Sequence, residues 1–195
     1  MAASETEERR GRVGGHVHDT ILAAAADLIC ERRVVPTMAE IAQEAGVGRA
    51  TVYRYFPSRE RLLQGLLEAA EKDAVQRLRE AHLASVPFPE ALARATRALV
   101  AVGSRILVVM REGGVPHHPK ERDELKSVIR RLLARGRREG YLRADVPQRW
   151  TEAIYGRTLL AGLEHVHDTG AGVEDASALI VEQFLHGSRL PPPAG

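Results

Sequence analysis

Two arginines and three hydroxyl-bearing residues share a stretch of seven positions, and this combination suits the binding of nucleic acid. The arginines are Arg49 and Arg54, and the hydroxyl groups belong to Thr51, Tyr53 and Tyr55. A guanidinium group matches the O6 and N7 acceptors of guanine, whereas hydroxyl groups commonly donate to phosphate oxygens. We therefore expect the two arginines to contact guanine edges and the three hydroxyl groups to contact the phosphate backbone.

These residues need a short helix to present them and a second helix to hold it in place. Thr37 and Glu40 form a Thr-x-x-Glu capping box, which begins a helix. Gly46 should end this helix, because glycine adopts the left-handed conformation at low cost. A second helix should run from about residue 48 to residue 55, and Pro57 should end it. Two short helices joined by a tight turn form a helix-turn-helix, which lays its second helix in the major groove of DNA.

The residues between Thr37 and Leu67 resemble the DNA-binding signature of the tetracycline-repressor (TetR) family of bacterial regulators. They contain Thr-Met-x-x-Ile-Ala-x-x-Ala-Gly-Val and then Thr-Val-Tyr-x-Tyr-Phe-x-Ser-Arg-Glu-x-Leu-Leu. The resemblance implies an all-α protein with an N-terminal three-helix DNA-binding domain and a C-terminal helical domain for ligand binding and dimerisation. The alternative is a buried helical hairpin whose Tyr and Arg residues form an ordinary amphipathic surface. The helix-turn-helix and the resemblance together assign DNA contacts to Thr37, Gly48, Arg49, Ala50, Thr51, Tyr53, Arg54, Tyr55 and Arg59.

The chain departs from this family pattern at two places. Gly48 stands where the family usually has Ser or Thr, so the second helix lacks a side-chain cap while its bare backbone can approach a phosphate closely. The link at residues 31–36 lacks the glycine that the family often places there. We therefore expect Arg33 or Val34 to adopt a less favourable backbone conformation.

Apolar periodicity predicts further helices at about residues 18–32, 58–83, 90–111, 121–139, 148–168 and 173–187. The expected organisation is a disordered N-terminal arm (1–15), a helix-turn-helix DNA-binding domain (16–60), a helical effector-binding and dimerisation domain (61–188) and a disordered tail (189–195). We interpret the arm as a solvated tail, although its arginines at positions 9, 10 and 12 offer a DNA groove contact as an alternative.

The last two helices carry apolar and small residues that suit a dimer surface, and in the family the equivalent helices pair with their copies. The alternative is that they only complete the core of one subunit. The expected interface residues are Ala153, Arg157, Leu160, Ala161, Glu164, Leu179 and Phe184. The resemblance also implies an apolar small-molecule site within residues 90–168, with core packing as the alternative for each apolar residue. Its expected lining is Leu99, Val102, Arg105, Ile106, Met110, Leu133, Trp150, Tyr155 and Leu159.

Composition bounds the remaining function classes. Hydrophobic residues make up 44% and charged residues 28% of the 195 residues, values ordinary for a soluble globular chain. No apolar run approaches the ~20 residues of a membrane span, and no signal peptide is recognisable, so we expect a cytoplasmic protein. Cys30 is the only cysteine, which excludes an internal disulfide and a cysteine-based metal site, and we expect it to be buried.

No catalytic arrangement stands out, so we expect neither an enzyme nor a cofactor. The histidines at 117, 118, 165 and 167 lack the carboxylate or cysteine neighbours of a metal site, and we expect them in loops or on the surface, with a metalloenzyme as the rival interpretation. The stretch Lys120–Arg143 holds nine cations against four acids. A solvated helix face is the favoured interpretation there, and an anionic effector or partner is the alternative.

The resemblance implies a repressor that binds a palindromic operator on double-stranded DNA as a homodimer and is released by a largely apolar small molecule. The first rival is an activator or a broad-specificity DNA-coating regulator of the same fold, which sequence preference and salt dependence would distinguish. The second is a ligand-binding helical dimer without DNA binding, against which the intact residues 37–56 argue.

Overall fold

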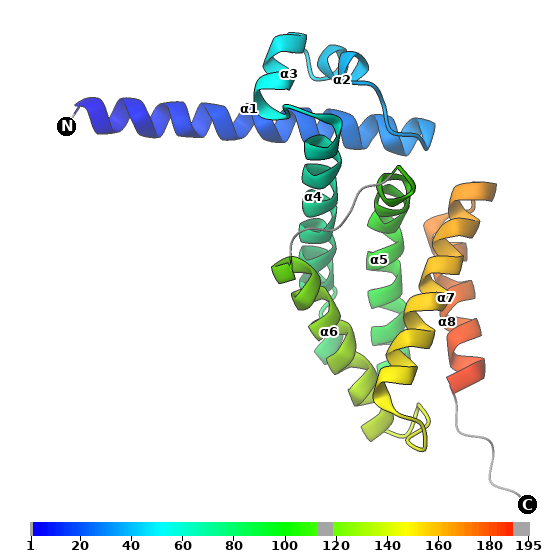
Figure 1. Cartoon of the computed structure of the whole chain (residues 1–195). Helices are drawn as coiled ribbons and strands as arrows, with labels where there is room; N and C mark the ends of the chain where they lie inside the picture. The colour runs from blue at the N-terminus through cyan, green and yellow to red at the C-terminus, as the bar shows by residue number, and fades with distance from the viewer. Residues whose placement is uncertain (1, 113–118, 189–195) are drawn as a thin grey trace, which may run out of the picture. The chain divides into compact units, whose positions relative to one another are not determined.

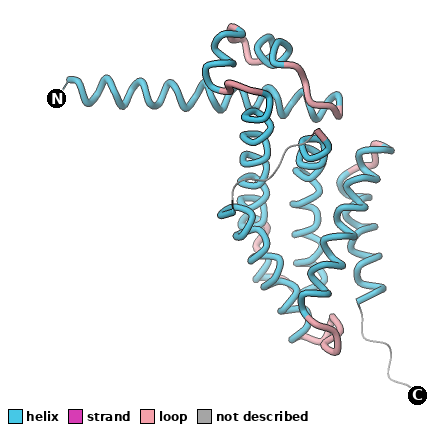
Figure 2. Tube along the Cα trace, in the orientation of Figure 1, coloured by secondary structure: helices cyan, strands magenta, loops and turns pink. Residues whose placement is uncertain are grey.

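The protein is helical throughout the part of the chain that the structure describes. The structure is a computed structural model and describes residues 2–112 and 119–188. Within these ranges every regular element is a helix (Figures 1 and 2), as the apolar periodicity predicts. The elements are α1 (Ala2–Arg32), α2 (Met38–Glu44), α3 (Arg49–Tyr55), α4 (Arg59–Glu80), η1 (Leu83–Ser85), α5 (Phe88–Arg111), α6 (Pro119–Arg138), α7 (Gln148–Thr169) and α8 (Val173–Ser188).

These helices form two compact units, which we describe separately. The first unit comprises residues 2–69 and 108–112, and the second comprises residues 70–107 and 119–188. Both α4 and α5 therefore contribute residues to each unit. The predicted C-terminal tail at 189–195 lies outside the described residues.

In the first unit, α2 and α3 lie together on one side of α1 (Figure 1). Their shared core is formed by Ile21 of α1, Ile41 of α2 and Val52 of α3, each fully buried, with Phe56 at the end of α3 also buried. Gly46, with φ of 65°, directly follows the C-cap residue Ala45 and has the left-handed conformation that the sequence predicts for the end of α2. The compact core holds the two short helices in fixed relation, which isolated helices of seven residues could not maintain.

The first helix begins earlier than the sequence predicts. The helix α1 starts at Ala2 instead of about residue 18, so it includes residues for which a disordered arm was predicted. Residues 2–12 are rich in Ala, Glu and Arg, which have high intrinsic helix propensity. The charge pattern that indicated a solvated tail is equally compatible with a solvated helix.

The connection between α1 and α2 carries the backbone strain that its missing glycine predicts. Arg33 has φ of 57°, in the left-handed region that glycine occupies most easily. Its amide donates to the Ile29 carbonyl oxygen at 2.8 Å, which closes the end of α1. Cys30 is exposed, so the prediction of a buried cysteine is wrong. Leu28 and Ile29 occupy the buried face of α1, and the next residue points away from it.

In the second unit, α5 packs with α6, α7 and α8 around a large apolar core. The core includes Phe88 of α5, Leu133 of α6, Tyr155 of α7 and Phe184 of α8, and none of these side chains is more than 2% exposed. The α7–α8 pair forms a helical hairpin (Figure 1) whose turn contains Gly170 with φ of 79°. Among the described residues, no helix has the length and apolar character needed to cross a membrane.

Glycine permits the close approach of α7 to α8. A Cβ atom at Gly162 would lie 2.3 Å from the Ile180 side chain, so no larger residue fits without a shift. Gly156 of the same helix differs, because a Cβ atom there would meet nothing within 4 Å, so it faces open space.

The favoured interpretation of the basic face of α6 was a wholly solvated face. Two of its cations instead hold neighbouring segments in place. Arg135 donates to the carbonyl oxygens of Leu83 and Val86, at 2.8 and 3.1 Å. Arg137 donates to the carbonyl oxygens of Arg143 and Val146 at 2.9 and 2.7 Å. These arginines supply hydrogen-bond donors to carbonyl oxygens of the connecting segments.

Candidate functional site

The short helix α3 divides sharply into a buried face and an exposed face. Val52 is 0% exposed and Phe56 just beyond the helix is 3% exposed, so these two side chains anchor it. Arg49 and Arg54 are exposed, and Tyr53 is 45% exposed. The predicted contact Ala50 is also exposed, whereas Thr51 and Tyr55 are half-buried. The predicted contact residues of α3 therefore lie outside the buried face that anchors the helix.

The two arginines of α3 are available to an external anion. Within the described residues, neither Arg49 nor Arg54 forms an ion pair with a carboxylate. The Arg54 guanidinium lies 5.2 Å from the centre of the Tyr55 ring, a cation–π arrangement that restrains both side chains. His18 of α1 also packs against this end of α3: its ring contacts the Tyr55 ring edge-on at 6.4 Å and stacks on Phe56 at 4.9 Å. Sequence reasoning missed this contact.

The start of α3 offers backbone amides without a side-chain cap. Gly48 is the N-cap residue, with φ of −69° and ψ of 147°, and no side chain accepts from the first turn. The absence of a Cβ atom leaves room for an anion to approach these amides. The missing side-chain cap at Gly48 is therefore confirmed, and a phosphate contact there stays a prediction.

The predicted phosphate contact Arg59, at the start of α4, has two partners within the first unit. Its Nη2 atom donates to Glu112 Oε2 at 2.9 Å, and its Nη1 atom donates to the Pro36 carbonyl oxygen at 3.3 Å. The Arg59 side chain is 39% exposed. Glu112 directly follows α5 in the chain, and sequence reasoning missed it because residues 53 positions apart carry no periodic signal. Arg59 can therefore bind a phosphate only in competition with a carboxylate.

Thr37 begins α2 through a complete capping box. Its hydroxyl group donates to Glu40 Oε2 at 2.7 Å and accepts from the Glu40 amide at 3.3 Å, and its own amide donates to Glu40 Oε2 at 2.8 Å. Arg32 donates to Glu40 Oε1 at 2.6 Å. The Thr37 amide, the Thr37 hydroxyl group and the Arg32 guanidinium lower the pKa of the Glu40 carboxyl. Although Thr37 is exposed, its polar groups first serve to fix the start of α2.

The second unit contains an apolar cavity of about 470 Å³ between α5, α6 and α7. Three of the predicted ligand-lining residues, Leu99, Tyr155 and Leu159, line it. The Tyr155 hydroxyl group lies 3.0 Å from Thr96 Oγ1, and burial raises the pKa of Tyr155 to about 12. The remaining lining consists of Leu125, Lys126, Ile129, Arg130, Arg149, Glu152, Ala153 and Gly156.

The other six predicted ligand-lining residues lie elsewhere. Val102 and Leu133 are fully buried in the core, and Ile106 is half-buried against it. Arg105 lies within an apolar run of α5, and its guanidinium donates to Asp73 Oδ2 at 2.8 Å. Its charge is therefore paired. Met110 is 43% exposed and Trp150 is 59% exposed. Leu125 and Ile129, which do line the cavity, are spaced like residues of an inward helix face, but apolar periodicity does not distinguish the core from a cavity wall.

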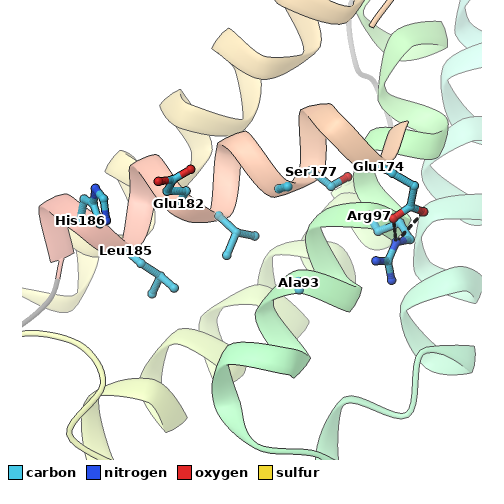
Figure 3. A pocket seen from close by; sticks show the side chains of 9 residues that line it. Ala93, Arg97, Glu174, Ser177, Glu182, Leu185 and His186 are labelled. Carbon is cyan, nitrogen blue, oxygen red and sulfur yellow. Dashed lines mark hydrogen bonds and ion pairs between the residues drawn. The ribbon is translucent and has the colours of Figure 1, made fainter. Parts of the chain in front are cut away.

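A second cavity of about 500 Å³ lies between α5 and α8 and has a more polar lining. Figure 3 shows Arg97 and Glu174 directed toward one another at one end, with Glu182 and His186 toward the other end. Arg97 Nε donates to Glu174 Oε2 at 2.8 Å, so these two charges compensate each other. None of the predicted ligand residues lines this cavity.

Most predicted interface residues of α7 and α8 are exposed. Leu160 is 36% exposed and Leu179 is 43% exposed, and the neighbouring Trp150 and Ile154 add further exposed apolar surface. Four other predicted residues are also exposed: Ala153, Arg157, Ala161 and Glu164. Phe184 differs, because it is 1% exposed and its ring meets the Tyr155 ring edge-on at 5.2 Å. Its side chain therefore belongs to the core of the subunit instead of an exposed face.

The described residues contain no group of three or more His, Cys, Asp or Glu residues placed to hold a metal ion. Of the histidines considered above, His165 is exposed and His167 is half-buried. The other two, at positions 117 and 118, lie outside the described residues.

Known proteins similar in sequence also carry a helix-turn-helix or are transcriptional regulators. Residues 21–66, which run from α1 through α2 and α3 into α4, match the family model for bacterial regulatory proteins of the tetR family. The HTH-type transcriptional repressor LfrR of Mycolicibacterium smegmatis is 29% identical over 147 residues, 74% of this chain and 76% of that protein. The nucleoid occlusion factor SlmA of Vibrio vulnificus is 35% identical over 80 residues, which are 40% of this chain and 37% of that protein.

A solved structure extends the similarity beyond the DNA-binding region. The TetR-like transcriptional regulator LfrR from Mycobacterium smegmatis, crystallised in complex with proflavine, superposes with a TM-score of 0.72 at 25% sequence identity. The match covers 90% of this chain and 99% of that chain. The tetR-family domain at residues 21–66, the helix-turn-helix formed by α2 and α3 and the similarity of both units to LfrR together support a TetR-family transcriptional regulator that binds DNA by homology.

Proposed function

We propose that the protein is a homodimeric repressor that binds a palindromic operator and releases it when a small molecule enters the second unit. The observation that carries the DNA-binding part is the division of α3. Two buried anchors fix the helix, while Arg49 and Arg54 remain exposed and free of carboxylate partners among the described residues. A rigid helix with available guanidinium groups can read guanine edges without first breaking internal ion pairs.

Phosphate contacts would position this helix in the groove. The candidates are the uncapped amides after Gly48, the hydroxyl groups of Thr51, Tyr53 and Tyr55, and the guanidinium of Arg59. We assign Thr37 a supporting role, because its hydroxyl group and amide are both engaged in the capping box. Ala50 is small and exposed, so it would allow close approach to a base edge.

The dimer would form through the exposed faces of α7 and α8. Trp150, Ile154, Leu160 and Leu179 expose apolar surface there, and such surface is costly to leave in water. A two-fold axis through this surface would repeat the recognition helix and match a palindrome. Leu160→Glu should give a monomer in light scattering. The control is Val34→Glu in the first unit, where the native side chain is 54% exposed, and it should leave the dimer intact.

Ligand release requires a ligand that favours the form unable to bind DNA. Two features support it. The cavity at Leu99 and Tyr155 has the size of a small-molecule site, and LfrR, a similar repressor, has been crystallised with proflavine. The helices α4 and α5 run continuously through both units, so a shift in the cavity would reach Arg59 and Glu112. We place this repressor in the cytoplasm, where it would meet its DNA.

The decisive experiment is selection from a random duplex library by the purified protein at near-physiological salt. Recovery of one palindrome would support a dimeric, sequence-specific regulator. Recovery without sequence enrichment, with binding that vanishes as salt rises, would support the DNA-coating rival instead. Transcription from a promoter carrying the recovered sequence would then distinguish repression from activation.

A further inference from the structure

We infer that the cavity between α5, α6 and α7 takes an anionic amphiphile, a molecule with an apolar body and one acidic group. This inference rests on the proposed effector function and names the chemical class of the effector. It follows from the arrangement of apolar and charged residues around the cavity.

The floor of the cavity is apolar and includes a single buried hydroxyl group. Leu99, Leu125, Ile129 and Leu159 supply aliphatic surface from three helices. The hydroxyl group of Tyr155 is already engaged with Thr96 at 3.0 Å. The floor therefore favours an alkyl or aryl body and offers little to a strongly polar one.

The rim carries three cations and one carboxylate. The cations are Lys126, Arg130 and Arg149, and the carboxylate belongs to Glu152. Glu152 Oε1 accepts from Gln148 Nε2 at 2.9 Å and lies 3.6 Å from Arg130 Nε. The only acid on the rim is therefore already compensated by Arg130 and a neighbouring amide.

The other two cations have no such compensation. Within the described residues, neither Lys126 nor Arg149 forms an ion pair or a hydrogen bond through its side chain. They differ in this respect from Arg135 and Arg137, whose guanidinium groups are held by loop carbonyls. Two uncompensated positive charges beside an apolar opening attract an acidic head group and repel a cationic one.

The test measures binding of three compounds with unbranched alkyl tails of nine or ten carbons: decanoate, decan-1-ol and decyltrimethylammonium. Calorimetry with the purified protein, below micelle-forming concentrations, should give binding of decanoate about tenfold tighter than decan-1-ol, with decyltrimethylammonium weakest. The advantage of decanoate should shrink as salt rises. In the double variant Lys126→Glu/Arg149→Glu, the order of the two charged compounds should reverse.

Gly156 locates the binding within this cavity. A Cβ atom there meets nothing within 4 Å, and leucine has higher helix propensity than glycine, so Gly156→Leu should fold while filling the opening. It should abolish binding of all three compounds, and Gly156→Ala serves as the matched control that adds only the Cβ atom.

Each outcome bears on a different part of the reasoning. Equal binding of decanoate and decan-1-ol, lost in Gly156→Leu, would overturn the charge inference and leave the cavity as the effector site. Binding that persists in Gly156→Leu, or no binding by any compound, would overturn the cavity assignment and the inference with it. Preferred decanoate binding without any change in operator affinity would support the ligand class and overturn ligand release in the proposed function.

Discussion

Tyr155, which is buried against Thr96, should make the folded protein less stable at alkaline pH. The substitution Tyr155→Phe should remove this loss of stability. Burial raises the pKa of Tyr155 from 10.0 to about 12. Below pH 10 the phenol is protonated in both the folded and unfolded states, so its contribution is fully present. As pH rises from 10 toward 12, the unfolded chain loses this proton first, and the folded state becomes less stable.

The magnitude follows from the separation of the two pKa values. At pH 11 the unfolded phenol is mostly ionised and the folded phenol mostly protonated, which corresponds to about 1.4 kcal/mol of lost stability. Urea denaturation at pH 8 and pH 11 should therefore show the native protein losing about 1.4 kcal/mol more than Tyr155→Phe. Other titrating groups contribute equally to both proteins and cancel in this comparison. An equal loss in both proteins would refute the assignment of a buried, protonated Tyr155.

The same pair predicts an asymmetry at neutral pH. The hydroxyl group of Thr96 also donates to the Leu92 carbonyl oxygen at 2.8 Å, so it keeps a partner in Tyr155→Phe. That variant should lose only about 0.5–1 kcal/mol. Thr96→Val leaves the Tyr155 hydroxyl group buried without its partner and should cost about 1–3 kcal/mol. Equal costs would indicate that Tyr155 has another hydrogen-bond partner.

Three further predictions concern the DNA-binding unit. Arg49→Ala should weaken operator binding by about 1–3 kcal/mol and relax the preference at one base position, measured by fluorescence anisotropy against a panel of single-base variants; uniform weakening across the panel would assign this arginine to phosphate instead. Glu112→Gln should tighten operator binding about twofold to fivefold by freeing Arg59, and Arg59→Ala should remove that gain, so a gain that survives in the double variant would exclude this competition. Thr37→Ala should lower the free energy of unfolding by about 1 kcal/mol through loss of the N-cap, as measured by urea denaturation at pH 7. The lowered pKa of Glu40 predicts a loss of stability below about pH 4.5, and this loss should be smaller in Thr37→Ala.

The caps and turns around α2 and α3 could be predicted from the sequence, because each signal acts over a few positions. The capping box at Thr37, the left-handed Gly46 and the strained Arg33 are all present in the structure. Each depends on backbone and side-chain chemistry within one helical turn. For the same reason, the predicted ends of α5, α6, α7 and α8 agree with the structure to within two residues.

The second unit was less predictable, because apolar periodicity identifies an inward face without identifying what lies opposite it. Phe184 reads equally well as interface or core, and only the contact with Tyr155 assigns it to the core. Leu133 and Leu159 have the same apolar character, yet one fills the core and the other lines a cavity.

The sequence by itself determined the helical class, the helix-turn-helix and the family, because periodicity, caps and a dense local motif are encoded over short distances. Only the tertiary structure decided which charges are free. It pairs Arg59 with Glu112 and Arg105 with Asp73, and it leaves Lys126 and Arg149 uncompensated beside an apolar cavity. Electrostatic partners are set by distance in space, which the spacing of residues along a chain does not specify.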